Sequence, residues 1–104
     1  MYVVAYRFVL LSPSPENDAR FVEIWSGLTE YFKSQCGALG SRLHLGEDGA
    51  FYAYAQWPNE EVFKAASEHV PEQAFMKLRL AWAELYGPSE VLFEGPVLRD
   101  LIVK

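Results

Sequence analysis

The feature that most restricts the fold of this chain is the dipeptide Asp48-Gly49, which lies between two runs of alternating residues. The runs are residues 39–46 and 50–57, and Asp-Gly between two such runs is a strong signal for a β-hairpin. A register that sets Leu43 opposite Ala53 places both on one face of the sheet. The other face of the hairpin then carries Arg42, His44, Tyr52, Tyr54 and Gln56.

Before the hairpin, the chain has the pattern of a strand followed by a helix. Residues 2–11 are β-branched and aromatic and would present apolar groups on both faces, which is typical of a strand at the centre of its sheet. Apolar residues spaced by three and four then follow the start signal Ser14-Pro15 and stop at Gly37. This spacing predicts one helix of about twenty residues.

After the hairpin, the chain returns to helical spacing and then to strand-like composition. A helical stretch begins at Pro58-Asn59, and a second, stronger helix starts at Pro71 and is stopped by Gly87-Pro88. Residues 89–103 form a final β-rich run. The Gly95-Pro96 dipeptide inside it predicts a bulge, a bend or an edge position.

The order strand, helix, strand, strand, helix, strand predicts an α+β fold of the ferredoxin-like βαββαβ sandwich type. We expect one domain over residues 1–104, with the helices on one face of an antiparallel sheet. The opposite face keeps tyrosine and valine side chains, and a second copy packed against it would cover them. The sequence therefore predicts a homodimer, as a dimeric α/β barrel whose broken last strand reaches the partner's sheet.

The aromatic content is high for a chain of this length, with seven Phe, six Tyr and three Trp in 104 residues. We expect this load to divide between two surfaces, because a small domain leaves much of its surface exposed. Between helices and sheet we place Phe21, Trp25, Phe32, Phe51, Trp57, Phe75 and Trp82. On the opposite sheet face we place Tyr2, Tyr6, Tyr52 and Tyr54.

Charge and composition exclude several classes of function. Nine basic and fourteen acidic residues give a net charge of −5, so the basic surface of a nucleic-acid binder is absent from the sequence. The apolar run at the N-terminus is too short to span a bilayer and has no basic flank, so we expect no membrane partner and a cytoplasmic location. With Cys36 as the one cysteine and His44 and His69 as the two histidines, we expect no disulfide, no metal site and no bound cofactor.

Residues 40–63 carry the most specific pattern of the chain. A Gly-rich approach over residues 37–41 leads through the hairpin to Tyr54-Ala55-Gln56-Trp57, followed by the acidic helix start Asn59–Glu61 and by Phe63. In these residues the chain resembles the antibiotic biosynthesis monooxygenase family of small dimeric α/β-barrel proteins. The order of elements extends the resemblance to nearly the whole chain. It implies a monooxygenase-like protein that acts on a small aromatic or polyketide-like molecule without a bound cofactor.

The resemblance also implies a site between sheet and helices. In the cofactor-free oxygenases of this family an Asn, a Trp, a Tyr and an Arg line the pocket. The Trp corresponds to Trp57, the Asn position to Ala53 and the Tyr position to Phe63, whereas Arg79 or Lys77 lies near the Arg position. Two polar groups of the family pattern are thus apolar in this chain.

The candidate substrate-binding residues are Trp57, Phe63, Trp25 and Trp82, which we expect to approach one apolar space. The catalytic residues stay open. Because the Asn and Tyr groups are replaced, His44 or Arg79 would have to supply the polar role, and histidine is the side chain suited to proton exchange near neutral pH.

Two other functions stay open from the sequence. A non-catalytic homodimer that binds a small hydrophobic or aromatic ligand is favoured by the apolar residues Ala53 and Phe63. A haem-handling protein is the third hypothesis, since that branch of the family also keeps a Trp near the end of its third strand. The positions of its usual histidines are Ala66 and Pro71 in this chain, and His69 lies at a different helical angle.

Overall fold

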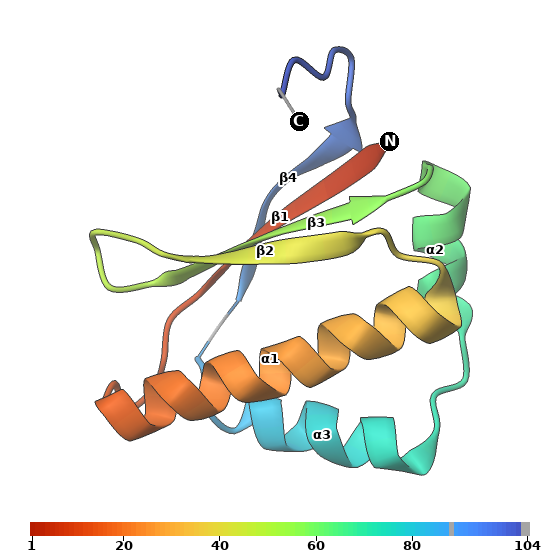
Figure 1. The fold of residues 1–104 in the computed structure, drawn as a ribbon. Helices are drawn as coiled ribbons and strands as arrows, with labels where there is room; N and C mark the ends of the chain where they lie inside the picture. The colour runs from red at the N-terminus through yellow and green to blue at the C-terminus, as the bar shows by residue number, and fades with distance from the viewer. Residues whose placement is uncertain (88, 103–104) are drawn as a thin grey trace.

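The computed structural model describes residues 1–87 and 89–102 and confirms the predicted α+β, ferredoxin-like fold. Helices α1 and α3 run side by side beneath one face of the sheet, and α2 stands beyond the end of β3 (Figure 1). The elements in chain order are β1 (Tyr2–Phe8), α1 (Pro15–Cys36), β2 (Gly40–Leu45), β3 (Phe51–Trp57), α2 (Glu60–Glu68), α3 (Gln73–Ala83) and β4 (Glu90–Pro96).

The described strands form one antiparallel sheet in the order β2-β3-β1-β4. The central position predicted for the first strand is confirmed, although the strand ends at Phe8 and only an isolated bridge from Leu10 to Tyr86 follows. The hairpin register is confirmed as well, since Leu43 pairs with Ala53. Gly49 has a φ of 83°, a left-handed conformation that glycine adopts without steric cost, which explains why the turn needs it.

Helix α1 begins and ends where its capping residues predict. The Ser14 hydroxyl accepts a hydrogen bond from the Asn17 backbone N–H at 3.0 Å, and Pro15 occupies the first turn. At the other end Gly37 has a φ of 78° and donates its backbone N–H to the Phe32 carbonyl. The cap residues therefore set the length of the helix that covers the sheet.

The second helical region is divided into two helices, as the sequence indicated. Asn59 caps α2 by accepting a hydrogen bond from the Val62 N–H at 2.9 Å, and α2 ends at Glu68. Helix α3 ends at Ala83, four residues before the predicted stop, because the next backbone groups bond to the segment after β1. The Leu11 N–H donates to the Leu85 carbonyl and the Gly87 N–H donates to the Val9 carbonyl. The predicted stop at Pro88 and the predicted strand end at Val103 lie outside the described residues.

Strand β4 lies at one edge of the sheet and ends at Pro96, which confirms the edge position predicted from Gly95-Pro96. The irregularity of this strand lies elsewhere. Its register shifts opposite Ala5 and Tyr6 of β1. The shift leaves the Gly95-Pro96 end in regular pairing with the start of β1, next to the site described below.

The core is a layer of mostly aromatic side chains between sheet and helices, called the aromatic layer here. Phe21 of α1 is fully buried in it. Tyr2 and Tyr6 also belong to this layer, so their predicted place on the opposite face is wrong. The prediction failed because β1 is apolar on both faces, and period-two alternation then does not tell one face from the other. Trp25 does not pack in the core clusters either, and it lies at the surface between α1 and β2.

Candidate functional site

One end of the aromatic layer is built around Trp57, the last residue of β3. Its side chain is 5% exposed. Its ring lies 5.4 Å from the Phe63 ring and 6.0 Å from the Phe32 ring, measured between centroids, and Tyr2 is its partner in the β1–β3 register. We call Tyr2, Val4, Phe32, Trp57 and Phe63 the Trp57 cluster.

The indole N–H of Trp57 is buried and has no hydrogen-bond partner among the described residues. A buried donor without a partner is uncommon in folded proteins and costs free energy, because the N–H loses its bonds to water and gains none in return. An oxygen atom of a bound molecule would satisfy it. The Trp57 indole is therefore a candidate binding group that the fold has left unused.

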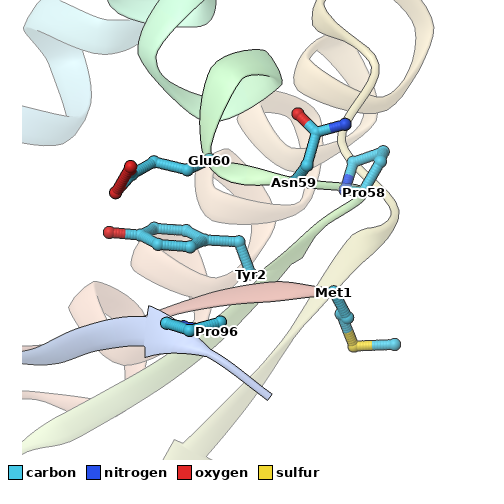
Figure 2. Close-up of a pocket in the computed structure, with 6 residues that line it drawn as sticks. All are labelled: Met1, Tyr2, Pro58, Asn59, Glu60 and Pro96. Carbon is cyan, nitrogen blue, oxygen red and sulfur yellow. The ribbon is translucent and has the colours of Figure 1, made fainter. Parts of the chain in front are cut away.

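A solvent-open hollow of about 260 Å³ lies beside this cluster. Figure 2 shows the Tyr2 ring between the side chains of Glu60 and Pro96 at this place. The hollow is lined by Met1, Tyr2, Pro58, Asn59, Glu60 and Pro96, which come from the start of β1, the β3–α2 junction and the end of β4. Among these lining residues Tyr2 alone is also a member of the Trp57 cluster.

The electrostatics of the hollow are acidic. The Tyr2 hydroxyl donates a hydrogen bond to the Glu94 carboxylate at 2.8 Å. This bond, followed by burial and by the negative charges of Glu94 and Glu60, raises the pKa of Tyr2 to about 12. The phenol is therefore protonated, and remains a donor, throughout the neutral range.

The other end of the aromatic layer is built around Trp82 of α3. Its ring lies 4.9 Å from Phe8, 5.1 Å from Phe21 and 4.9 Å from Tyr86. We call Phe8, Phe21, Trp82 and Tyr86 the Trp82 cluster. The Trp82 indole N–H also lacks a partner among the described residues, but neither of the hollows described here is lined by this cluster.

The structure brings together only part of the predicted substrate-binding set. Trp57 and Phe63 are in contact, whereas Trp82 lies in the separate cluster. Trp25 lines a second surface hollow of about 180 Å³, together with Ser41 and other residues of α1 and β2. The expectation that the four rings approach one space does not hold in this structure.

The two candidate catalytic residues lie away from Trp57. His44 is exposed on β2, in register with Tyr52 on the outer face, which is the sheet face directed away from the helices. Arg79 is exposed on α3. Burial raises the pKa of Tyr86 and the charge of Arg79 partly opposes this rise, so Arg79 lies at the Trp82 end.

A polar network covers the outer face at that same end. The Arg7 guanidinium donates to the Tyr52 hydroxyl at 3.2 Å and to Asp48 at 3.1 Å, and it lies 3.5 Å from the Glu90 carboxylate. Tyr52 donates to Asp48 at 2.6 Å, and this bond together with the Ala50 N–H and Arg7 lowers the pKa of Asp48 to about 2. Arg7 is thus paired with the carboxylates of Asp48 and Glu90.

His69 follows α2, and its Nε2 atom lies 2.8 Å from the Tyr31 hydroxyl. His69 is the histidine that a haem-handling function would need, and in this structure it is engaged in a side-chain hydrogen bond. Within residues 1–87 and 89–102, no group of three or more His, Cys, Asp and Glu side chains is arranged to hold a metal ion.

Sequence reasoning missed the residues around the hollow. Tyr2 was placed on the wrong face, and Glu60 was interpreted only as a favourable charge at a helix start. Glu94 had no signal of its own, since its contact with Tyr2 joins residues 92 positions apart. The pairing of Tyr2 with Pro96 in the β1–β4 register brings these groups together.

The fold and this site define the class of protein: an α+β ferredoxin-like sandwich of the type found in dimeric α/β barrels. The sequence model of the family described as antibiotic biosynthesis monooxygenase matches residues 2–78. The chain belongs to this family, which confirms the resemblance seen in the sequence. No curated protein matches the chain.

Solved structures with the same fold include oxygenases. SnoaB, a cofactor-independent oxygenase from Streptomyces nogalater, solved as an asparagine-to-alanine variant, is 20% identical with a TM-score of 0.72, covering 96% of this chain and 95% of that chain. A monooxygenase from the gene ActVA-Orf6 of Streptomyces coelicolor, solved with the ligand nanaomycin D, is 28% identical with a TM-score of 0.71, covering 99% and 91%. Rv0793 from Mycobacterium tuberculosis is 12% identical with a TM-score of 0.66, covering 98% and 100%.

Among the described residues, no helix is both long enough and apolar enough to cross a bilayer.

Proposed function

We propose that this chain is an oxygenase that uses no bound cofactor and acts on a small aromatic or polyketide-like molecule held beside Trp57. The observation that carries the proposal is the buried, partnerless indole N–H of Trp57, packed against Phe63 and next to an open hollow. Membership of the family supports it. So does the likeness to SnoaB, described as a cofactor-independent oxygenase, and to a monooxygenase solved with nanaomycin D.

The proposed chemistry balances without a cofactor. A phenolic substrate and O₂ give a quinone and water: one oxygen atom forms the new carbonyl, the other leaves as water, and the substrate itself is oxidised. The rate of such a reaction rises when a donor is aimed at the oxygen on which negative charge develops. In this proposal the Trp57 N–H is that donor and the Phe63 ring forms the apolar wall that orients the substrate.

The other predicted site residues have more limited roles in the proposal. Trp82 would act only on a ligand that enters deeply, and Trp25 only on one at the α1–β2 surface. His44 and Arg79 stay as candidates for the polar role, His44 from the outer face and Arg79 from α3. Substituting either by Ala and measuring oxygen uptake tests whether it takes part.

We also propose that the protein acts as a homodimer. Exposed apolar side chains gather on the edge strand β4 and on the segment after it: Val91, Leu92, Phe93, Leu98, Leu101 and Ile102. Phe93 pairs with Ala5 on the outer face, so a second copy of this chain laid against that face would bury it. Sedimentation velocity at micromolar concentration should give twice the chain mass, and Phe93→Glu should shift it towards the monomer. A monomer for the unmodified chain would contradict this part of the proposal.

A non-catalytic binding protein is the second candidate, because Ala53, at the Asn position of the family pattern, is part of the apolar core. Ala53 is buried with Phe8, Phe21 and Phe51, so no polar group stands where the family pattern has an Asn. Oxygen uptake with 1-naphthol and related phenols separates the two functions. Uptake that Trp57→Phe abolishes supports the oxygenase, whereas a ligand-induced rise in melting temperature without uptake supports the binding protein.

A further inference from the structure

One side chain belongs both to the lining of the hollow and to the cluster that contains the Trp57 indole. Tyr2 lines the hollow on one side and belongs to the Trp57 cluster on the other. Its ring stacks on Phe63, with centroids 5.6 Å apart and ring planes 26° apart. Because Tyr2 lies at the hollow (Figure 2) and stacks on Phe63, a molecule that enters the Trp57 cluster from the hollow would meet the Tyr2 ring.

The Tyr2 side chain is held in place through its hydroxyl, which faces the carboxylates of Glu94 and Glu60. Its hydroxyl donates to the Glu94 carboxylate at 2.8 Å, and Glu94 belongs to β4, the edge strand of the sheet. The other contacts of the ring are apolar and stacked. Such a side chain has two alternatives: the stacked and bonded position of this structure, and a rotated position that opens the layer.

We propose that Tyr2 is a gate and specificity-determining residue, which closes the path from the hollow to Trp57 and is latched by Glu94. This inference rests on the proposed function, since it assumes that the ligand binds beside Trp57. The ligands admitted are aromatic molecules flat enough to replace the Tyr2 ring in its stack on Phe63. The gate also accounts for a binding group that is buried in this structure.

The latch is tested by the rate at which an aromatic probe enters. The full chain is mixed with 1,4-naphthoquinone in a stopped-flow instrument, and the quenching of tryptophan fluorescence gives the association rate constant. Tyr2→Phe and Glu94→Ala remove the same hydrogen bond, so each should raise this constant by about three- to tenfold. The double variant should show no further increase, because the two changes remove one shared interaction.

Tyr6→Phe is the matched control. Tyr6 lies on the same strand and packs in the same aromatic layer, but it is not among the residues that line the hollow. Its association rate constant should equal that of the unmodified chain. The association rate constant of Tyr2→Ala, which removes the gate, should exceed that of Tyr2→Phe. A melting curve checks that Tyr2→Ala folds.

The outcomes separate the gate from the proposed function. Equal rate constants in all Tyr2 and Glu94 variants, with binding that still depends on Trp57, would overturn the gate and leave the proposed function standing. Binding by Tyr2→Ala but not by the unmodified chain would support the gate. If no folded variant, Tyr2→Ala included, binds the probe, the gate is overturned. Oxygen uptake with 1-naphthol and related phenols then tests the proposed function independently.

Discussion

The two ends of the aromatic layer are built from similar residues but are closed in different ways. At the Trp82 end, backbone hydrogen bonds close the layer, from Leu11 to Leu85 and from Gly87 to Val9. At the Trp57 end, the side chain of Tyr2 and its bond to Glu94 close it beside an open hollow. Neither indole N–H has a hydrogen-bond partner among the described residues, and in the proposed gate only the one at the Trp57 end lies behind a side chain, Tyr2, that can change rotamer.

Burial alone therefore does not distinguish a core tryptophan from a binding-site tryptophan. Opening the Trp82 end requires breaking backbone pairing, which is a sub-global event, whereas opening the Trp57 end requires the Tyr2 side chain to leave its hydrogen bond to Glu94 and its stack on Phe63. A tryptophan in the first setting is part of the core, and one in the second is placed to meet a ligand.

The largest effect should come from truncating the rigid end. Phe21 is fully buried in the Trp82 cluster, and Phe21→Ala should lower the free energy of unfolding by about 3–5 kcal/mol. Phe63→Ala at the Trp57 end should cost roughly half as much, because Phe63 is only partly buried. Urea unfolding measures both. Equal losses of free energy of unfolding would show that the two ends are equally well packed and would contradict the difference described between them.

The next effect concerns catalysis. Trp57→Phe keeps an aromatic ring but removes the N–H, and we expect kcat/KM for 1-naphthol to fall by about 100-fold. Trp82→Phe is the matched change at the other end and should lower it by less than about threefold. Oxygen uptake measures both variants. A larger loss in Trp82→Phe would move the site to the Trp82 end.

A smaller effect is expected in acid, on the outer face at the Trp82 end. The pKa of Asp48 is lowered to about 2 in the folded chain by Tyr52, by the Ala50 N–H and by Arg7, so its ionised form favours folding. This stabilisation is present above the ordinary aspartate pKa and is lost as the pH falls from about 4 towards 2. At pH 6 the free energy of unfolding should therefore be lower for Asp48→Asn than for the unmodified chain. At pH 3 this difference between the two proteins should be smaller. An unchanged difference between the two proteins would contradict the assignment.

The smallest effect is expected in alkali, at the Trp57 end. The pKa of Tyr2 is raised to about 12, so its contribution to folding is complete below pH 10 and is lost as the pH rises through 12. Burial also raises the pKa of Tyr6 and Tyr86, so an ultraviolet titration of tyrosinate should show several phenols that ionise late, and Tyr2→Phe should remove one of them. Glu94→Ala should return that phenol towards the ordinary range. If the number of late phenols is the same in Tyr2→Phe as in the unmodified chain, the latch is wrongly assigned.

The sequence predicted the fold well because the relevant signals are local. Asp48-Gly49 sets the hairpin register, and Ser14, Pro15 and Gly37 set the bounds of α1. Each signal acts through the backbone of neighbouring residues, so its effect can be read without knowledge of the tertiary structure. The end of α3 was missed because it depends on pairing with the segment after β1, which is a distant contact.

The site was predicted less well, and the reason is again the range of the contacts. Trp57 and Phe63 were found through a family pattern within one stretch of the chain. Tyr2 and Glu94 meet only because β1 and β4 pair, and the apolar pattern of β1 does not reveal which of its faces meets the helices. Trp25 was misplaced because helical spacing defines a stripe but not the width of the buried part.

The most direct test of the account is whether a ligand reaches the Trp57 indole. Labelling with ¹⁵N gives a signal for each of the three tryptophan indole N–H groups, and Trp57→Phe, Trp25→Phe and Trp82→Phe assign them. On addition of 1,4-naphthoquinone, the account predicts a shift of the Trp57 signal, with the Trp25 and Trp82 signals nearly unchanged. A ligand that binds while the Trp57 signal stays in place would contradict it.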